Sequence, residues 1–156
     1  MSKSLKRVRD ALDAAGIDAE IMEMQVETRT AEQAAAAAGC QTDQIAKSII
    51  FRGESGGHVV LFITAGGNRV DPRLASAVAG EPLGKADADL IRAETGFAIG
   101  GVAPLAHLRP VRAFFDPRLL AFDRVWAAAG TPRHIFPIAP DRLLALSGAA
   151  VAMFTG

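Results

Sequence analysis

Hydrophobic and polar positions recur with two different periods along the chain, and these periods predict both helices and strands. Leu5, Val8 and Leu12 lie at helical spacing, so we expect a first helix that Ser4 caps and Gly16 ends. Short runs rich in β-branched and aromatic residues predict strands. These runs are 19–24, 45–51, 58–64, 111–115, 122–127, 134–138 and 151–154.

Capping residues and glycines set the bounds of four more predicted helices. Thr30 and Gln33 form a capping-box pattern ahead of an alanine run, which Gly39 closes. Helix-opening residues at the start and a glycine at the end predict the others, at 71–80, 87–96 and 140–148. The turn-forming residues 52–57 separate two β-rich runs and predict a hairpin.

These elements are short and mixed, without regular β-α-β alternation and without repeats. The pattern predicts an α+β, or mixed α/β, fold with a curved, mainly antiparallel sheet flanked by short helices. We see no linker that would divide residues 1–156, so we expect a single domain.

Composition narrows the classes of function. The 156 residues are 50% hydrophobic and carry no net charge, with a pI near 6.8. Proteins that follow a phosphate backbone carry a basic excess, so duplex DNA is not an expected partner, whereas contact with the end of a nucleic acid is compatible. The N-terminus lacks a signal-like apolar segment, no apolar run is long enough for a membrane span, and Cys40 is the only cysteine. We therefore expect a cytoplasmic protein without membrane contact.

Lys47 is the first candidate for chemistry. In an extended segment it shares a face with the apolar residues Ile45, Ile49 and Phe51, where an ammonium group is costly unless it reaches water or an anion. Two interpretations stay open. Lys47 either extends to solvent from the start of the strand, which the pattern alone favours, or stands at a pocket mouth and binds a phosphate or an oxyanion.

The second candidate is the loop from Gly100 to Pro104. Adjacent glycines allow a close main-chain approach to a ligand, and the amides of such a loop can polarise an ester carbonyl. Proline stiffens its far end. The alternative interpretation is a plain turn between elements, which is the commoner role of an isolated Gly-Gly pair.

Other types of active site are not supported. His58, His107 and His134 lack metal-ligand spacing, and a single cysteine gives no thiolate zinc site, so we expect no metal and no cofactor. Neither a nucleophile elbow nor a phosphate-binding glycine loop is present. Ser48 directly follows Lys47, so the two side chains would face opposite sides of a strand, which argues against a Ser–Lys dyad.

The candidate motifs occur together in one order. They are Ile45-Ala46-Lys47-Ser48-Ile49-Ile50-Phe51, then Arg69-Val70-Asp71, Gly100-Gly101-Val102-Ala103-Pro104, Phe115-Asp116 and Ala128-Ala129-Gly130-Thr131-Pro132. In this order the sequence resembles the YbaK / prolyl-tRNA synthetase-associated family of aminoacyl-tRNA deacylases, from Thr30 to about Val151. The resemblance implies a barrel-like mixed sheet with flanking helices. It also implies a trans-editing hydrolase that removes a small wrong amino acid from tRNA, with tRNA for proline as one candidate.

The resemblance also suggests roles for individual residues. Lys47, Gly100 and Gly101 match the family's catalytic lysine and glycine loop. The same motifs suggest the substrate-binding residues Ser48, Phe51, Asp71, Val102, Pro104, Asp116, Ala129 and Gly130. The implied partners are the acceptor end of an aminoacyl-tRNA and an aminoacyl-tRNA synthetase.

Two departures bear on specificity. Some close relatives carry asparagine where this chain has Ser48, and some carry a pocket histidine to which His134 does not align. The competing hypothesis is a non-catalytic module of the same fold that binds a tRNA end or a nucleotide. The sequence shows no obvious general base, and the resemblance implies that a hydroxyl of the substrate's ribose activates the attacking water.

Overall fold

The structure is a computed structural model that describes residues 2–28 and 30–156. Its α-helices are α1 (Lys3–Ala14), α2 (Ala31–Ala38), α3 (Pro72–Ala79), α4 (Ala88–Thr95) and α5 (Pro140–Ser147), and its two 3-10 helices are η1 (Thr42–Gln44) and η2 (Pro117–Ala121). The strands are β1 (Met22–Glu23), β2 (Ile45–Gly53), β3 (Val59–Ala65), β4 (Leu83–Lys85), β5 (Arg112–Phe115), β6 (Val125–Ala128), β7 (His134–Ile138) and β8 (Ala150–Val151).

One mixed sheet joins these strands. Its order is β1-β7-β6-β2-β3-β5-β8, with β4 paired to the far end of β2. The pairs β1–β7, β2–β3, β2–β4 and β6–β7 are antiparallel, and the pairs β2–β6, β3–β5 and β5–β8 are parallel. Antiparallel pairs thus form the majority, as predicted, and β1 and β8 are the two ends of a sheet that does not close. The fold is the expected mixed α/β class.

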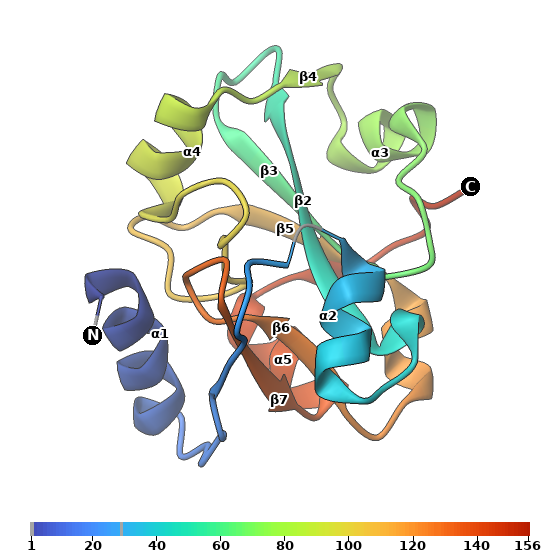
Figure 1. Cartoon of the computed structure of the whole chain (residues 1–156). Coiled ribbons are helices and arrows are strands. Elements are labelled where there is room, and N and C mark those ends of the chain that lie inside the picture. The colour runs from blue at the N-terminus through green and yellow to red at the C-terminus, as the bar shows by residue number, and fades with distance from the viewer. Residues whose placement is uncertain (1, 29) are drawn as a thin grey trace.

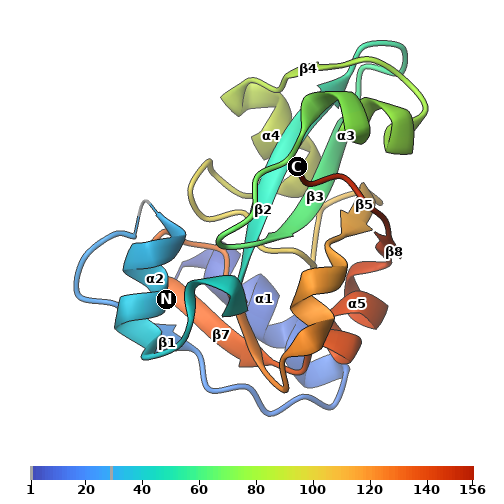
Figure 2. The same cartoon turned by 90° about the vertical axis from the view of Figure 1, so that its right-hand side faces the viewer.

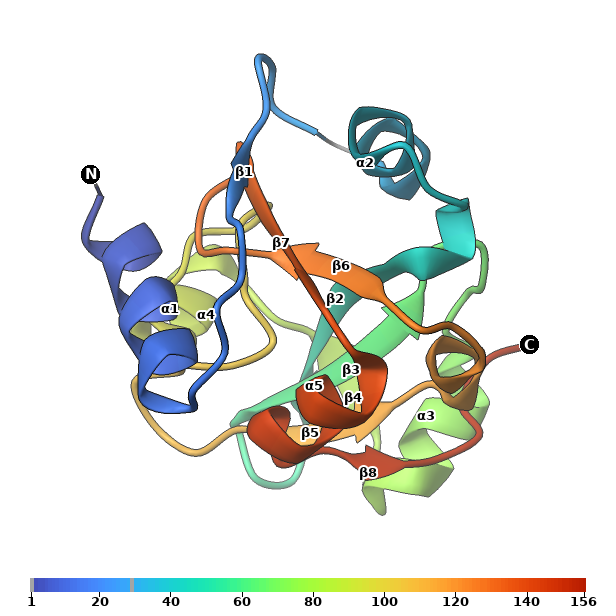
Figure 3. The ribbon, with the colours of Figure 1, turned by 90° about the horizontal axis from the view of Figure 1, so that it is seen from below.

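Helices cover the sheet on several sides. In Figure 1 the β2–β3 hairpin rises from the body of the molecule, with α3 and α4 on either side of its upper end, and Figure 2 shows the same arrangement turned by 90°. Seen from below, α1 and α2 lie on opposite sides of β1 and β7 (Figure 3). The main core packs Val8 of α1 and Leu143 of α5 against Leu61 and Ile63 of β3, all essentially fully buried.

Local sequence explains most element bounds. Thr30 and Gln33 form the predicted capping box of α2, and Asp71 caps α3 by accepting a hydrogen bond from the Arg73 amide at 2.9 Å. Four helices end at a glycine in the left-handed conformation, because a residue without Cβ adopts that conformation at little cost.

Three predictions need correction. Ser2, not Ser4, caps α1, because its hydroxyl accepts a hydrogen bond from the Leu5 amide at 3.0 Å. The expected strand 19–24 shrinks to the two residues of β1, whose only partner among the described residues is the edge of β7. Strand β4 was not expected, since Leu83–Lys85 is short and contains a glycine, and it forms by pairing with β2.

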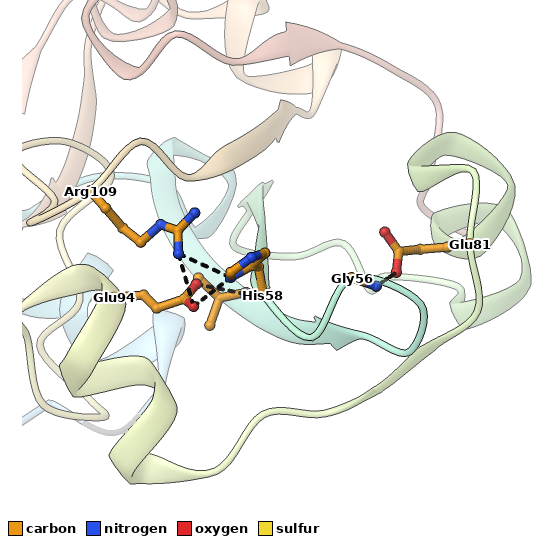
Figure 4. A network of polar contacts seen from close by, with 6 residues as sticks. Gly56, His58, Glu81, Glu94 and Arg109 are labelled. Atoms are coloured by element: carbon orange, nitrogen blue, oxygen red, sulfur yellow. Dashed lines mark hydrogen bonds and ion pairs between the residues drawn. The ribbon is translucent and has the colours of Figure 1, made fainter.

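A buried carboxylate fixes α4 to the start of β3. Glu94 accepts hydrogen bonds from the His58 Nδ1–H at 2.8 Å and the Val59 amide at 3.0 Å, with Arg109 Nη1 at 3.6 Å (Figure 4). Burial alone would raise the pKa of Glu94, but these donors and the positive charges outweigh it and lower that pKa. The network also holds Ile91 of α4 in place, and Ile91 is one of the residues that line a cavity beside β2.

Candidate functional site

A cavity of about 720 Å³ lies where the middle of β2 meets α2, β6 and the glycine loop. Its walls are mostly apolar, and the ionisable side chains among its described lining residues are Glu27, Lys47 and Lys85. Predicted site residues that line it are Lys47, Ser48, Gly100 and Val102. The structure therefore brings together two motifs that are more than fifty residues apart in the sequence.

Lys47 projects from the face of β2 that was expected. Ile45 on this face packs into the cluster around Trp126, and Ile49 and Phe51 pack against the cluster around Phe62, whereas Ala46 and Ile50 belong to the core on the opposite face. The Lys47 ammonium donates a hydrogen bond to the Gly66 carbonyl at 3.2 Å. Partial burial lowers the pKa of Lys47, and nearby acidic side chains oppose that effect. Lys47 is thus a partly desolvated cation at the cavity wall.

The turn that accepts the Lys47 hydrogen bond is itself held rigidly. Buried Asp116 accepts hydrogen bonds from the Ala65 amide at 3.1 Å and from the Asn68 side chain at 2.9 Å. At Gly66 a Cβ would come within 2.1 Å of the Thr42 carbonyl oxygen, so only glycine fits this packing. Asp116 is not among the cavity-lining residues, and its contacts make it a positioning residue for the Lys47 acceptor.

The glycine loop begins with a tight turn. The Gly101 amide donates to the Ala98 carbonyl at 3.0 Å, and Gly100, at the third position, has φ +92°. Positive φ at that position is the signature of a type II turn and favours glycine. Because the Gly101 amide is used within the turn, it is not free to bind a carbonyl. Over the described residues, the amides of Gly100 and Val102 have no recorded hydrogen-bond partner, and both residues line the cavity.

A second loop, at residues 129–131, packs against the glycine loop. A Cβ on Gly101 would lie 2.7 Å from the Thr131 Cα, so the two main chains touch. Gly130 has φ +97°, and a Cβ there would lie 2.7 Å from the Ser4 carbonyl oxygen. Ala129 is fully buried, and its amide donates to His134 at 2.9 Å. Gly101, Ala129 and Gly130 therefore shape the loop without lining the cavity.

Three further predicted site residues lie away from the cavity lining. Asp71 caps α3 on the other side of the hairpin, and Phe51 packs edge-on against Phe62 at a centroid distance of 5.7 Å. Pro104, at the end of the glycine loop, is buried. Their contacts are structural, and their roles as substrate ligands remain predictions.

Several residues of the cavity wall were not among the site residues predicted from the sequence. Ala31 and Ala34 of α2 line it, as do Trp126 of β6 and Lys85 of β4. The two alanines lie three apart on one face of the helix, and small side chains on one face are the signal that could have indicated a close approach. Trp126 and Lys85 reach the cavity through long-range strand pairing, for which the local sequence carries no signal.

A second, smaller hollow adjoins the first. It has a volume of about 480 Å³ and shares Glu27 and Pro132 with the main cavity. Arg9 and Arg133 contribute positive charge to it, Glu23 and Glu27 contribute negative charge, and His134 Nδ1 lies 2.6 Å from the Thr131 hydroxyl. The described residues contain no cluster of three or more metal-ligating side chains, and no described helix is long and apolar enough to cross a membrane.

Comparison with known proteins defines the class of the molecule. Residues 25–146 match the model of the aminoacyl-tRNA editing domain, so the chain belongs to the aminoacyl-tRNA editing domain family. This confirms the resemblance drawn from the Lys47 and glycine-loop motifs.

Individual relatives are similar to this chain over nearly its whole length. The chain is 44% identical to a protein whose crystal structure is described as "a putative trans-editing enzyme for prolyl tRNA synthetase", with a TM-score of 0.92 over 100% of this chain and 99% of that one. It is 28% identical to hypothetical protein APE2540, with a TM-score of 0.86 over 96% and 99% of the two chains. It is also 30% identical to the uncharacterized protein YwhH of Bacillus subtilis (strain 168), over 90% of this chain and 88% of that protein.

Proposed function

We propose that this protein hydrolyses the ester bond between a small amino acid and the terminal ribose of a mischarged tRNA. The observation that carries the proposal is that Lys47, Gly100 and Val102 meet around one cavity in a chain of the editing-domain family, and that the two loop amides have no hydrogen-bond partner among the described residues. The similar protein described as a trans-editing enzyme for prolyl tRNA synthetase favours tRNA for proline and that synthetase as partners.

Main-chain amides supply the electrostatic part of the mechanism. Water attacks the ester carbonyl, and the amides of Gly100 and Val102 stabilise the negative charge that develops on its oxygen. The C–O bond to the ribose then breaks, the ribose oxygen takes up a proton, and the free amino acid leaves. The glycine loop is thus still the oxyanion site. The Gly101 amide is bonded to the Ala98 carbonyl, so the Val102 amide takes the role that was expected of Gly101.

Lys47 anchors the substrate. Its pKa is lowered by burial, but the acidic side chains Glu32, Asp116 and Asp43 act in the opposite direction and favour the charged form. A partly desolvated ammonium binds a phosphate or a carbonyl more strongly than one in bulk water. Its present acceptor, the Gly66 carbonyl, is neutral, so an anionic group of the tRNA end would bind Lys47 in its place.

No cavity-lining side chain is suited to act as general base. Among the described lining residues, Glu27 is the only carboxylate, it is exposed at the rim, and no histidine is present. We therefore assign water activation to the vicinal hydroxyl of the substrate's ribose. Aminoacyl esters are intrinsically labile, and each ~1.4 kcal/mol of transition-state stabilisation gives about a tenfold acceleration.

The smaller hollow offers a path for the rest of the acceptor strand. Arg9 and Arg133 are exposed there, next to the rim residue Glu27 that both hollows share. Guanidinium groups bind phosphates well, so these two side chains are suited to the phosphates that precede the terminal nucleotide.

A panel of aminoacyl-tRNAs tests the proposal. Deacylation of at least one small-amino-acid ester should exceed buffer hydrolysis at least tenfold, and bulky amino acids should be spared because they do not fit. If the protein binds these tRNAs but cleaves none of them, the competing hypothesis of a non-catalytic binding module replaces ours.

A further inference from the structure

The middle of β2 has a partner on one side only. Strand β6 pairs with Ile45 and Ala46, and β4 pairs with residues 51–53. Between these two contacts, residues 47–50 pair with β3 alone among the described strands. Because the same residues line the main cavity, a gap in the sheet opens into the candidate site.

Hydrogen bonds at the hairpin end show toward which neighbouring strand the main-chain groups of each β2 residue point. The Gly53 amide donates to His58 on the β3 side, and the Glu54 amide donates to Pro82 on the β4 side, both at 2.9 Å. The register between β2 and β3 is unbroken over residues 46–52. Main-chain groups of an antiparallel strand alternate in direction. The main-chain N–H and C=O groups of odd-numbered β2 residues therefore point to β3, and those of even-numbered residues point to the opposite edge.

Ser48 and Ile50 are the even-numbered residues in the gap. The amide and carbonyl of Ser48 and the amide of Ile50 thus point toward the cavity, where the pairings with β4 and β6 do not reach them among the described strands. Buried main-chain groups without partners are rare, and open strand edges bind added strands. The Ser48 Oγ is also buried without a hydrogen-bond partner. Among the described residues, Ser48 thus has a main-chain amide and carbonyl outside any strand pairing on that side and a hydroxyl without a partner.

This edge matches the polar groups of an amino acid ester. A strand residue offers an N–H donor and a carbonyl acceptor on the same side, and an aminoacyl group carries an ammonium donor and an ester carbonyl in the same order. Glu27 is the only carboxylate that the described part of the chain contributes to the cavity lining, and it is exposed, so a bound ammonium has main-chain carbonyls as its acceptors deeper inside.

We propose that the open edge of β2 recognises the α-ammonium group of the substrate, with the Ser48 carbonyl as its acceptor. This inference rests on the proposed deacylase function and concerns the part of the substrate that the site recognises. The α-ammonium group then lies at the edge of β2, while the ester carbonyl faces the amides of Gly100 and Val102. Esters without a free α-amino group, including N-acylated ones, lose this contact.

Substrate analogues test the proposal directly. Alanyl, lactyl and propionyl esters of the same tRNA have nearly the same size but carry an ammonium, a hydroxyl and a hydrogen, respectively. After division by each ester's buffer hydrolysis rate, kcat/KM should fall at least tenfold from alanyl to propionyl, with lactyl between them. Equal normalised values for all three, within twofold, would overturn the proposal while leaving the deacylase function intact.

Hydrogen exchange gives a second measurement that needs no turnover. In the free protein the amides of Ser48 and Ile50 should exchange faster than those of Lys47 and Ile49, which serve as matched internal controls within the β2–β3 ladder. Saturation with 3′-alanylamino-3′-deoxyadenosine, a stable amide analogue, should slow exchange at Ser48 or Ile50, because the added group covers the edge. If the analogue binds and both amides exchange as before, the proposal is wrong, whether or not the esters are cleaved.

Discussion

The ammonium group of Lys47 lies 3.2 Å from the carbonyl oxygen of Gly66, at the turn that follows β3. Because Asp116 and the Thr42 carbonyl confine that turn, Lys47 has a fixed resting position beside the cavity. The acceptor is neutral, so an anionic ligand competes for the same ammonium. The site is thus arranged before the substrate arrives, which lowers the ordering cost of binding.

Gly100 should be required for its backbone conformation. Its φ of +92° disfavours any side chain, so Gly100→Ala should lower the free energy of unfolding by about 1–2 kcal/mol. Gly57→Ala is the matched control, because Gly57 has φ +75° in a hairpin turn outside the cavity lining, with open space around its Cβ position. Denaturation and deacylation rates should show similar destabilisation of both variants but loss of activity only at Gly100. Equal activity losses would contradict the loop's role.

Arg9 and Arg133 should contribute to tRNA binding rather than to chemistry. Replacing either by alanine should raise KM several-fold with kcat nearly unchanged, and should reduce the salt dependence of binding by about one phosphate contact. Arg73→Ala is the control, since Arg73 is exposed on α3 outside both hollows. Titrations of tRNA binding at several salt concentrations measure the effect. If the salt dependence of the binding constant is unchanged in both variants, the acceptor strand does not bind at these arginines.

Glu94 should make stability fall in acid. Its pKa is lowered in the folded state, so its stabilising contribution is complete above the unfolded-state value of about 4.3 and is lost as pH falls through the folded value. Glu94→Gln should cost about 1–3 kcal/mol near pH 7, and the difference from wild type should shrink in acid. Urea denaturation at several pH values measures this. Glu54→Gln, at an exposed ion pair with Arg52, should show almost no effect at any pH.

Ser48→Ala should not reduce stability. The buried Oγ lacks a partner, so its removal should leave the free energy of unfolding unchanged or raise it by about 1 kcal/mol. Ser147→Ala is the matched control, because the Ser147 hydroxyl donates to Leu144 at 3.1 Å and accepts from Ala149 at 3.2 Å, and its loss should destabilise. Thermal unfolding compares the two variants. A Ser48 variant destabilised as much as the Ser147 variant would mean that Oγ is satisfied.

Local signals in the sequence predicted much of the fold. Local sequence predicted the capping box at Thr30, the Asp71 cap and the turn between β2 and β3, because each depends on residues close together in the chain. The first cap was placed at Ser4 instead of Ser2 because both serines precede the same apolar stripe. Parallel pairing of β2 with β6 joins residues about eighty positions apart and could not be read from either segment.

The candidate site was predicted only in part. Lys47, Ser48, Gly100 and Val102 do meet at one cavity, and the family resemblance rather than the local pattern singled them out. Asp71 and Asp116 belong to family motifs, yet their side chains cap and brace the main chain. A motif shows that a residue matters without showing whether it contacts the ligand. The gap in the sheet beside Ser48 depends on where β4 and β6 stop, which no sequence pattern indicates.

The most direct test of the central claim compares Lys47→Ala with wild type on the best substrate of the aminoacyl-tRNA panel. Loss of one charge-assisted contact should lower kcat/KM by about 10- to 100-fold without loss of stability. Lys6→Ala, on the exposed face of α1, should retain the wild-type rate. If the Lys47 variant, correctly folded, deacylates the tRNA as fast as wild type, the account of this site is wrong.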